Sequence, residues 1–186
     1  MDIFLVRHGE ASATWGQSAD PGLSELGQQQ AATAAQVLLP LLPDSVTLIS
    51  SPLARAQETA APLASALGCD VAIEPVFREI PSPVPLAERQ DWLRQFMQQR
   101  WQEQGDDLHH WRQAAVDYLH AMPGAAVIFT HFLVINTVAG YALGRDETCH
   151  FYPDNGSVTH LRRNGTGTQS VLQVSRLGAE LSSFVN

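Results

Sequence analysis

The sequence predicts an α/β fold: a three-layer α/β/α sandwich with a mostly parallel central sheet. Short apolar runs alternate along the chain with longer segments of helical periodicity, which is the pattern of successive strand-helix units. One run, Ala125 to Phe129, is apolar without interruption, as expected for a parallel strand buried on both faces. With 186 residues, 45% of them hydrophobic and 16% charged, the chain is long enough for one well-packed domain and short for two. We therefore expect a single domain over residues 1–186.

The first strand-helix unit is expected at the N-terminus. A strand over 2–6 leads into a loop and then into a helix over 25–39. Ser24 is the residue type that caps helix N-termini, and Pro40 cannot continue a helix. These two residues therefore mark the ends of the first helix.

A second unit and a third strand follow. A strand over 46–49 precedes a helix that we expect to begin at Pro52, with Ser51 as its N-cap, and to stop at Gly68. A short strand over 71–74 comes next. The chain then enters a proline-rich loop, with Pro81, Pro83 and Pro85, which cannot hold regular structure.

Two helices are predicted over 86–103 and 108–122, separated by Gly105-Asp106-Asp107. Residues 81–122 could form a helical lid or insert over a binding cleft. The segment carries large aromatic residues at helical spacing, and such residues more often lie in a core than in a lid. Both interpretations stay open at this point for Trp92, Phe96 and Trp101.

The last elements complete the sheet. The apolar strand at 125–129 is followed by a helix from about His131 to Gly144. Two further runs, 157–162 and 169–175, alternate between apolar and polar residues and flank a turn-forming segment, which predicts a hairpin.

Composition excludes several classes of partner and mechanism. A net charge of −8 and a pI near 5.2 argue against nucleic acid, because binding a phosphate backbone needs a basic surface. The chain has no lysine, so its 11 basic residues are all arginine. This rules out Schiff-base chemistry and a lysine-dependent P-loop, although the lack of lysine could equally reflect genome composition. Any phosphate site must be built from arginine, whose planar guanidinium suits phosphate oxygens.

The chain shows no sign of export or of a membrane span. Met1 leads directly into the first strand without a basic and apolar leader, so we expect a cytoplasmic protein. The most apolar window, 124–144, is interrupted by polar residues and is better explained as a strand followed by a helix than as a membrane helix. Cys69 and Cys149 lack metal-binding or redox spacing and are expected to be reduced thiols.

Cationic or potentially cationic side chains follow three of the predicted strands. Arg7-His8 follows the first, Arg55 lies early in the helix after the second, and His131 follows the strand at 125–129. The carboxyl ends of parallel strands meet at one crevice, where helix N-termini also favour anions. Arg55 opposes its own helix dipole at a cost of about 0.3–1 kcal/mol, and a bound anion would reverse that cost. Its alternative is a surface pair with Glu58.

His8 is the candidate nucleophile, since Gly9 lets the backbone turn and approach a ligand closely. A zinc site from His8 and His131 is the alternative, but no third ligand stands at a recognised spacing and Arg7 would repel a dication. A serine hydrolase would need a Gly-x-Ser-x-Gly segment, which the chain lacks. We therefore predict no metal.

Several of these segments together carry a family pattern. The segment Leu5-Val6-Arg7-His8-Gly9-Glu10 resembles the signature of the histidine phosphatase superfamily, the phosphoglycerate-mutase-like proteins. Further segments of that family are matched in the same order at 23–31, 50–60, 77–80 and 130–131. The resemblance runs from residue 3 to about residue 136.

The resemblance implies a role for each matched residue. His8 would attack phosphorus and become a phosphohistidine, while Arg7, Arg55 and His131 would hold the phosphoryl oxygens. Glu79 would be the general acid. Phosphoryl transfer needs in-line positioning and charge stabilisation, and this set can supply both without a metal or another cofactor.

Two points of the match are less direct. Glu10 and Glu74 are alternative acids, and Glu79 could instead pair with Arg78. Many family members place an asparagine after the first motif, but this chain has none before residue 136, so Ser12, Thr14 or Gln17 would have to contact phosphate instead. Phe132 also replaces the usual glycine after the second histidine, where it could crowd the pocket or pack against the helix.

The leading prediction is a metal-independent phosphomonoester hydrolase that acts on a phosphorylated small molecule. The alternatives are a phosphoglycerate mutase-type transferase, a phosphatase for phosphohistidine on a protein partner, and a non-catalytic phosphate-binding module. No feature of the sequence predicts the substrate or the oligomeric state.

Overall fold

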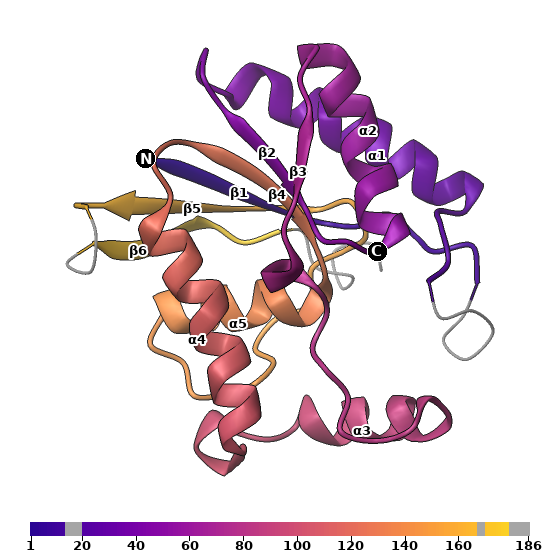
Figure 1. Ribbon diagram of the computed structural model, residues 1–186, viewed down its shortest axis with the longest axis vertical. Helices are drawn as coiled ribbons and strands as arrows, with labels where there is room; N and C mark the ends of the chain where they lie inside the picture. The colour runs from indigo at the N-terminus through magenta and orange to yellow at the C-terminus, as the bar shows by residue number, and fades with distance from the viewer. Residues whose placement is uncertain (14–19, 167–169, 179–186) are drawn as a thin grey trace, which may run out of the picture.

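The computed structural model describes residues 1–13, 20–166 and 170–178. Its centre is a mixed sheet with the strand order β3-β2-β4-β1-β5-β6 (Figure 1). Neighbouring strands are parallel from β3 to β1, and β5 runs antiparallel to both β1 and β6. The strands are β1 (Asp2–Arg7), β2 (Thr47–Ser50), β3 (Val71–Ile73), β4 (Ala126–Thr130), β5 (Val158–Asn164) and β6 (Val171–Arg176). The predicted hairpin is confirmed as β5 and β6, and residues 167–169 between them lie outside the described part.

Helices cover both faces of this sheet (Figure 1). Residues of α1 and α2 pack on one face, and residues of α4 and α5 pack on the other. The prediction of a three-layer α/β fold is therefore confirmed. The α-helices are α1 (Glu25–Leu38), α2 (Ala54–Leu67), α3 (Arg89–Phe96), α4 (Asp106–Ala121) and α5 (Phe132–Ala142). In the described ranges, none of them has the length and apolar character needed to cross a membrane.

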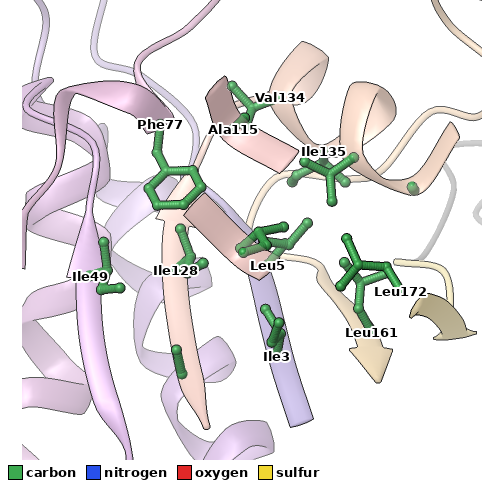
Figure 2. Packing of buried hydrophobic residues seen from close by; sticks show 14 of the residues in the cluster. Ile3, Leu5, Ile49, Phe77, Ala115, Ile128, Val134, Ile135, Leu161 and Leu172 are labelled. Atoms are coloured by element: carbon green, nitrogen blue, oxygen red, sulfur yellow. The ribbon is translucent and has the colours of Figure 1, made fainter. Parts of the chain in front are cut away.

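Alternate residues of β1 point into two different cores. Phe4 and Val6 pack with Leu38 of α1 and Leu63 of α2. Ile3 and Leu5 belong to the opposite core (Figure 2), whose members include Ile49, Ile128, Leu119, Val134, Ile135 and Leu161. All five residues of β4 are buried, as the uninterrupted apolar run predicts. Burial of apolar area on both faces holds the sheet rigid between its helix layers.

The strand register places the candidate site residues at one level. Arg7 in β1 lies opposite Thr130 in β4, and Ser50 in β2 lies opposite Phe129 in β4. All three strands therefore end together at their carboxyl ends. The residues that follow these strands, among them His8 and His131, meet at this edge of the sheet.

The capping predictions hold for the first helix and need correction for the second. Ser24 Oγ accepts a hydrogen bond from Gly27 N at 3.0 Å and caps α1, as predicted. α1 ends at Leu38, and Pro40 lies in the 3₁₀ turn Leu39–Leu41 that follows, so the α-helix stops just before the proline, as predicted. The second helix begins at Ala54 rather than Pro52. Ser51 is not its cap, because Leu53 occupies the N-cap position; the Ser51 hydroxyl accepts from Leu53 N at 3.3 Å and lies 2.7 Å from His131 Nε2.

The prediction of one continuous helix over 86–103 is wrong. The structure has 3₁₀ turns at Leu86–Glu88 and Trp101–Glu103, with α3 between them. Contacts with a distant segment break the helix after Phe96: Thr148 Oγ1 donates to the Phe96 and Gln99 carbonyls, and Trp101 N donates to Asp146 O at 2.7 Å. Local helical periodicity cannot reveal hydrogen bonds between residues that lie about 50 positions apart in the sequence.

A third, smaller apolar cluster joins this segment to the body of the protein. Phe96 and Trp101 are fully buried and pack with Ile80, Leu93 and Leu133. Leu133 lies in the first turn of α5, directly after His131 and Phe132. The aromatic residues of the segment thus contact the helix that carries part of the candidate site.

Gly27→Ala is expected to destabilise the protein. Alanine is favoured over glycine inside a helix by about 1 kcal/mol, but a Cβ at Gly27 would lie 2.1 Å from Glu10 O. Both the helix and the loop after β1 would have to shift, at a cost of about 1–3 kcal/mol or more. Urea unfolding would measure the change. Gly124→Ala is the matched control, since a Cβ there meets nothing within 4 Å; equal stabilities of the two variants would contradict the prediction.

Candidate active site

Backbone hydrogen bonds fix the loop that follows β1. His8 N donates to Thr130 O at 3.0 Å, and Gly9 N donates to Thr59 Oγ1 at 3.0 Å. A Cβ at Gly9 would lie 2.4 Å from Gly27 O, so only glycine lets α1 approach this loop so closely. The strand end, β4 and α2 together hold the backbone of His8 in place.

The hydrogen bonds of His8 define its protonation state. Its Nδ1 lies 2.7 Å from Gly9 O, and a carbonyl can only accept, so Nδ1 carries the proton. Arg55 Nε donates to His8 Nε2 at 3.1 Å, so Nε2 presents a lone pair. Burial, with the Arg55 charge beside it, lowers the pKa of His8 to about 3. His8 is therefore a neutral imidazole whose unprotonated Nε2 faces Arg55.

Arg55 also contacts His131. Its Nη2 lies 3.4 Å from His131 Nδ1, and because a guanidinium can only donate, Nδ1 is the acceptor. His131 Nε2 therefore donates to Ser51 Oγ. Burial, together with His8 and Arg55, holds the pKa of His131 well below its usual value. The two imidazole rings lie 5.1 Å apart between centroids.

The alternative pairing of Arg55 with Glu58 is not found. The Glu58 carboxylate accepts from Leu23 N at 2.6 Å. Arg55 instead forms an ion pair with Asp20, with 3.9 Å between Arg55 Nη1 and Asp20 Oδ1, and Glu79 lines the same cavity. Arg55 thus keeps its guanidinium directed at the two histidines.

Arg7 approaches the same site from the end of β1. Its Nη1 donates to Pro153 O at 2.7 Å, and its Cζ lies 5.2 Å from the centre of the Phe132 ring. Phe132 therefore packs against Arg7, and it does not line the cavity. The aromatic ring at the position of the usual glycine supports the arginine rather than filling the pocket.

The Glu79 side chain is buried against the first turn of α5. Its Oε1 accepts from Ile80 N at 3.0 Å, and its Oε2 accepts from Leu133 N at 3.5 Å. Burial raises the pKa of Glu79 and favours the protonated form that a general acid needs. The alternative acids lie elsewhere: Glu10 is exposed and accepts from Ser24 Oγ at 2.8 Å, and Glu74 interacts with Tyr118.

A cavity of about 430 Å³ opens onto these groups, and His8, Arg55 and Glu79 line it. Arg7 and His131 do not line it. His131 contacts Arg55, which does, and Arg7 lies close enough to His8 to contribute to its lowered pKa. Ser12 is exposed and does not line it, and the predicted alternatives Thr14 and Gln17 lie outside the described residues. Within 1–13, 20–166 and 170–178, no cluster of three His, Cys, Asp or Glu side chains could hold a metal ion.

Asn155 is a site residue that sequence reasoning did not select. Its Nδ2 donates to His8 O at 2.9 Å, and the next residue, Gly156, donates from its backbone N to Arg7 O at 3.0 Å. The Asn-Gly pair forms a turn before β5, with Gly156 at φ 75°. Its second function, anchoring the loop after β1, depends on a contact 147 residues away along the chain. No local signal in the sequence could reveal it.

Asn155→Ala is expected to lower both stability and any phosphatase activity. Losing the Asn155 hydrogen bond to the largely buried His8 carbonyl costs about 1–3 kcal/mol, and the less firmly held His8 should lower kcat/KM by about tenfold. Thermal unfolding and steady-state kinetics would measure these changes. Asn164→Ala removes a similar side-chain bond at an exposed site, to Gln173, and should change neither quantity; equal behaviour of both variants would exclude an anchoring role.

Comparison with known proteins identifies the family. The profile of the histidine phosphatase superfamily, branch 1, matches residues 3–175. The chain belongs to this superfamily. The resemblance noted in its motifs is thereby confirmed, and it extends over nearly the whole chain.

Similar sequences include proteins described as probable phosphoglycerate mutases. The one from Erwinia tasmaniensis is 34% identical over 123 residues, which is 63% of this chain and 50% of that protein. The one from Cronobacter sakazakii is 40% identical over 88 residues, which is 43% of this chain and 38% of that protein. This histidine phosphatase superfamily member thus matches half or less of the length of these relatives.

Similar structures support the fold. A putative alpha-ribazole-5'-P phosphatase from Escherichia coli gives a TM-score of 0.73 at 20% identity, covering 96% of this chain and 97% of that one. A mycobacterial glucosyl-3-phosphoglycerate phosphatase complexed with VO3 gives a TM-score of 0.71 at 22% identity, covering 96% and 99%. At these identities the likeness establishes a shared histidine phosphatase fold.

Proposed function

We propose that this protein hydrolyses phosphomonoesters, without a metal, through a phosphohistidine on His8. The observation that carries the proposal is the tautomer of His8: Nδ1 is tied to Gly9 O, which leaves the Nε2 lone pair next to Arg55 at the cavity. A neutral imidazole held this way can attack phosphorus at neutral pH. The superfamily membership agrees with phosphatase or phosphotransferase chemistry.

The reaction would proceed in two displacements. His8 Nε2 forms a bond to phosphorus as the bond from phosphorus to the ester oxygen breaks, and protonated Glu79 donates its proton to the leaving alcohol. Glu79, now a carboxylate, then takes a proton from water as the water oxygen attacks the phosphohistidine. Inorganic phosphate leaves and Nε2 regains its lone pair. The cationic Arg7 and Arg55 stabilise the charge on the equatorial oxygens throughout.

Phosphoglycerate mutase activity is the second candidate, and the similarity to probable phosphoglycerate mutases favours it. A mutase uses the same first displacement but returns the phosphoryl group to a substrate oxygen instead of to water. Retaining and re-delivering that group requires surroundings that exclude water. This chain matches half or less of the length of those relatives, so the similarity alone does not carry their whole activity over to it.

A panel of phosphomonoesters, assayed with and without a chelator, would test the proposal. We expect phosphate release that resists EDTA, and an acid-labile, alkali-stable phosphoenzyme when the reaction is quenched with alkali. Interconversion of 3- and 2-phosphoglycerate in the presence of a bisphosphorylated activator would favour the mutase. Turnover only of a phosphohistidine protein would favour the protein phosphatase. Binding of phosphate without turnover of any substrate would favour a non-catalytic phosphate-binding module.

The charge of the site should depend on whether an anion is bound. In the empty site, burial and Arg55 lower the pKa of His8 to about 3, so its imidazole should stay neutral through the range from pH 8 to pH 5. A bound phosphate offsets the arginine charge and should raise the pKa of both His8 and His131. Histidine Cε1 chemical shifts, assigned with His8→Ala protein, would follow both titrations. A His8 that titrates near pH 6.5 in the empty protein would contradict the described geometry.

A further inference from the structure

We propose that Arg78 and Arg89 bind a second anionic group of the substrate, a carboxylate or a second phosphate, in addition to the phosphoryl group at His8. This inference rests on the proposed function and specifies its substrate class. Both arginines line the same cavity as His8 and Glu79. The substrate would then be a phosphomonoester whose alcohol part is itself negatively charged.

The balance of charge in the cavity is the first argument. Its described lining residues include three arginines, Arg55, Arg78 and Arg89, and one acidic residue, Glu79. Arg55 is already committed to the two histidines, which form the phosphoryl end of the site. The chain as a whole carries a net charge of −8, so this concentration of positive charge is local. A single phosphoryl group does not account for it.

The second argument is how Arg89 is held. Its Nη2 donates to Ile80 O at 2.9 Å, and Ile80 directly follows Glu79. The guanidinium is therefore fixed at the cavity wall next to the general acid, although Arg89 lies ten residues further along the chain. Arg78 precedes Glu79 and is exposed. Arg89 is thus partly preorganised, and Arg78 can adjust to the ligand; a guanidinium can bind a carboxylate or phosphate through two parallel hydrogen bonds.

The third argument is the size and chemistry of the remaining wall. A cavity of about 430 Å³ has room for an alcohol part of several atoms beside the phosphoryl group. Apart from Ser82, the wall away from the catalytic groups is apolar, with Pro81, Leu86 and Trp111. In the described part of the lining, Arg78 and Arg89 are therefore the charged groups beside the space for an alcohol part, outside the catalytic set.

A simpler role for these arginines is long-range attraction of any phosphate. Such steering would raise association with all phosphate esters and would weaken with salt, but it would not distinguish esters that differ only in the alcohol part. Direct binding of a second anion would distinguish them. The decisive measurement is therefore discrimination between matched substrates.

Two substrate pairs provide the test. 3-Phosphoglycerate and glycerol 3-phosphate differ in a carboxylate against a hydroxymethyl group, and propane-1,3-diol bisphosphate and its monophosphate differ in a second phosphate. We expect kcat/KM to favour the doubly anionic member of at least one pair by about tenfold or more. In Arg78→Gln, Arg89→Gln protein this ratio should fall about tenfold. The pair that shows the preference identifies the second anion as carboxylate or phosphate.

Arg94→Gln is the matched control. Arg94 lies on the same helix as Arg89, is 61% exposed and pairs with Asp91 outside the cavity, so its loss should leave the ratio unchanged. If the double variant does not fold, Arg78→Gln alone carries the test, because its side chain is exposed. A wild-type ratio near one for both pairs, or a ratio unaffected by the arginine substitutions, would overturn the inference.

Failure of the inference can be separated from failure of the proposed function. If no ester is hydrolysed, the proposed hydrolase is wrong, but binding of the same pairs can still be measured by calorimetry. His8→Ala protein is suited to this, since it would bind substrate without turning it over. Equal affinity for both members of each pair would reject the second anion site, and tighter binding of the doubly anionic member would support it.

Discussion

His8→Ala protein is expected to lose hydrolysis of every phosphomonoester, by at least about 10³-fold in kcat. The substitution removes the only group in the cavity whose geometry presents a nucleophilic lone pair next to a guanidinium, among the residues that the structure describes. The phosphoenzyme should disappear with it. Steady-state phosphate release and alkaline quenching after exposure to labelled ester would measure the two effects on the same preparation.

A control variant and a binding measurement distinguish loss of the nucleophile from loss of the folded structure. His110→Ala is the control, because His110 is exposed on α4, away from the cavity, and should retain full activity. His8→Ala protein should still bind orthophosphate, since Arg7, Arg55 and His131 remain. Retention of a phosphohistidine in His8→Ala protein would place the nucleophile elsewhere and refute the assignment.

Glu79→Gln is expected to impair esters unequally. An alkyl alcohol is a poor leaving group and needs a proton, so kcat/KM for alkyl phosphates should fall by about 10²–10⁴-fold. p-Nitrophenolate leaves without protonation, so kcat/KM for its ester should change little. Because Glu79 would also activate water, breakdown of the phosphoenzyme should slow, and a burst of nitrophenolate should precede a slow steady state. Stopped-flow absorbance would show the burst.

The raised pKa of Glu79 adds a second signature to this prediction. A carboxyl group that stays protonated to higher pH than usual keeps donating as the pH rises, and the alkaline loss of alkyl ester hydrolysis should report its deprotonation. This alkaline decrease should be absent from the pH profile of the residual activity of Glu79→Gln protein. Glu10→Gln is the matched control, since Glu10 is exposed and serves Ser24 at the start of α1. Equal losses on both ester types would mean that Glu79 acts only through structure.

The sequence could predict the fold and the grouping of the charged residues for a definite physical reason. Parallel strands end at a common edge, so residues that follow apolar runs, such as His8 and His131, must meet there. Arg55 could be added because a cation in the first turn of a helix is unfavourable without an anion nearby. These arguments need only the local pattern and the geometry of a parallel sheet.

What the sequence could not show depends on contacts between distant segments. The tautomer of His8 is decided by the Gly9 carbonyl and Arg55, and Ser51 is drawn from its expected capping role to His131. The helix expected over 86–103 is broken by Thr148. Asn155 anchors the loop of His8 from the opposite end of the chain. Each of these features depends on a hydrogen bond whose partner is set by the tertiary structure, and a local sequence pattern cannot identify that partner.

The hydrogen bond from Arg55 Nε to His8 Nε2 affects which molecules can react with His8. In the empty site the nucleophilic lone pair is occupied, since it already accepts a hydrogen bond. A neutral electrophile offers Arg55 no better partner and therefore meets a masked histidine. A phosphate ester offers its oxygens to the guanidinium, and only then is the lone pair released toward phosphorus. Under the proposed function, the reactivity of His8 therefore depends on the charge of the incoming molecule, and we expect the imidazole to resist alkylation and acylation by neutral reagents.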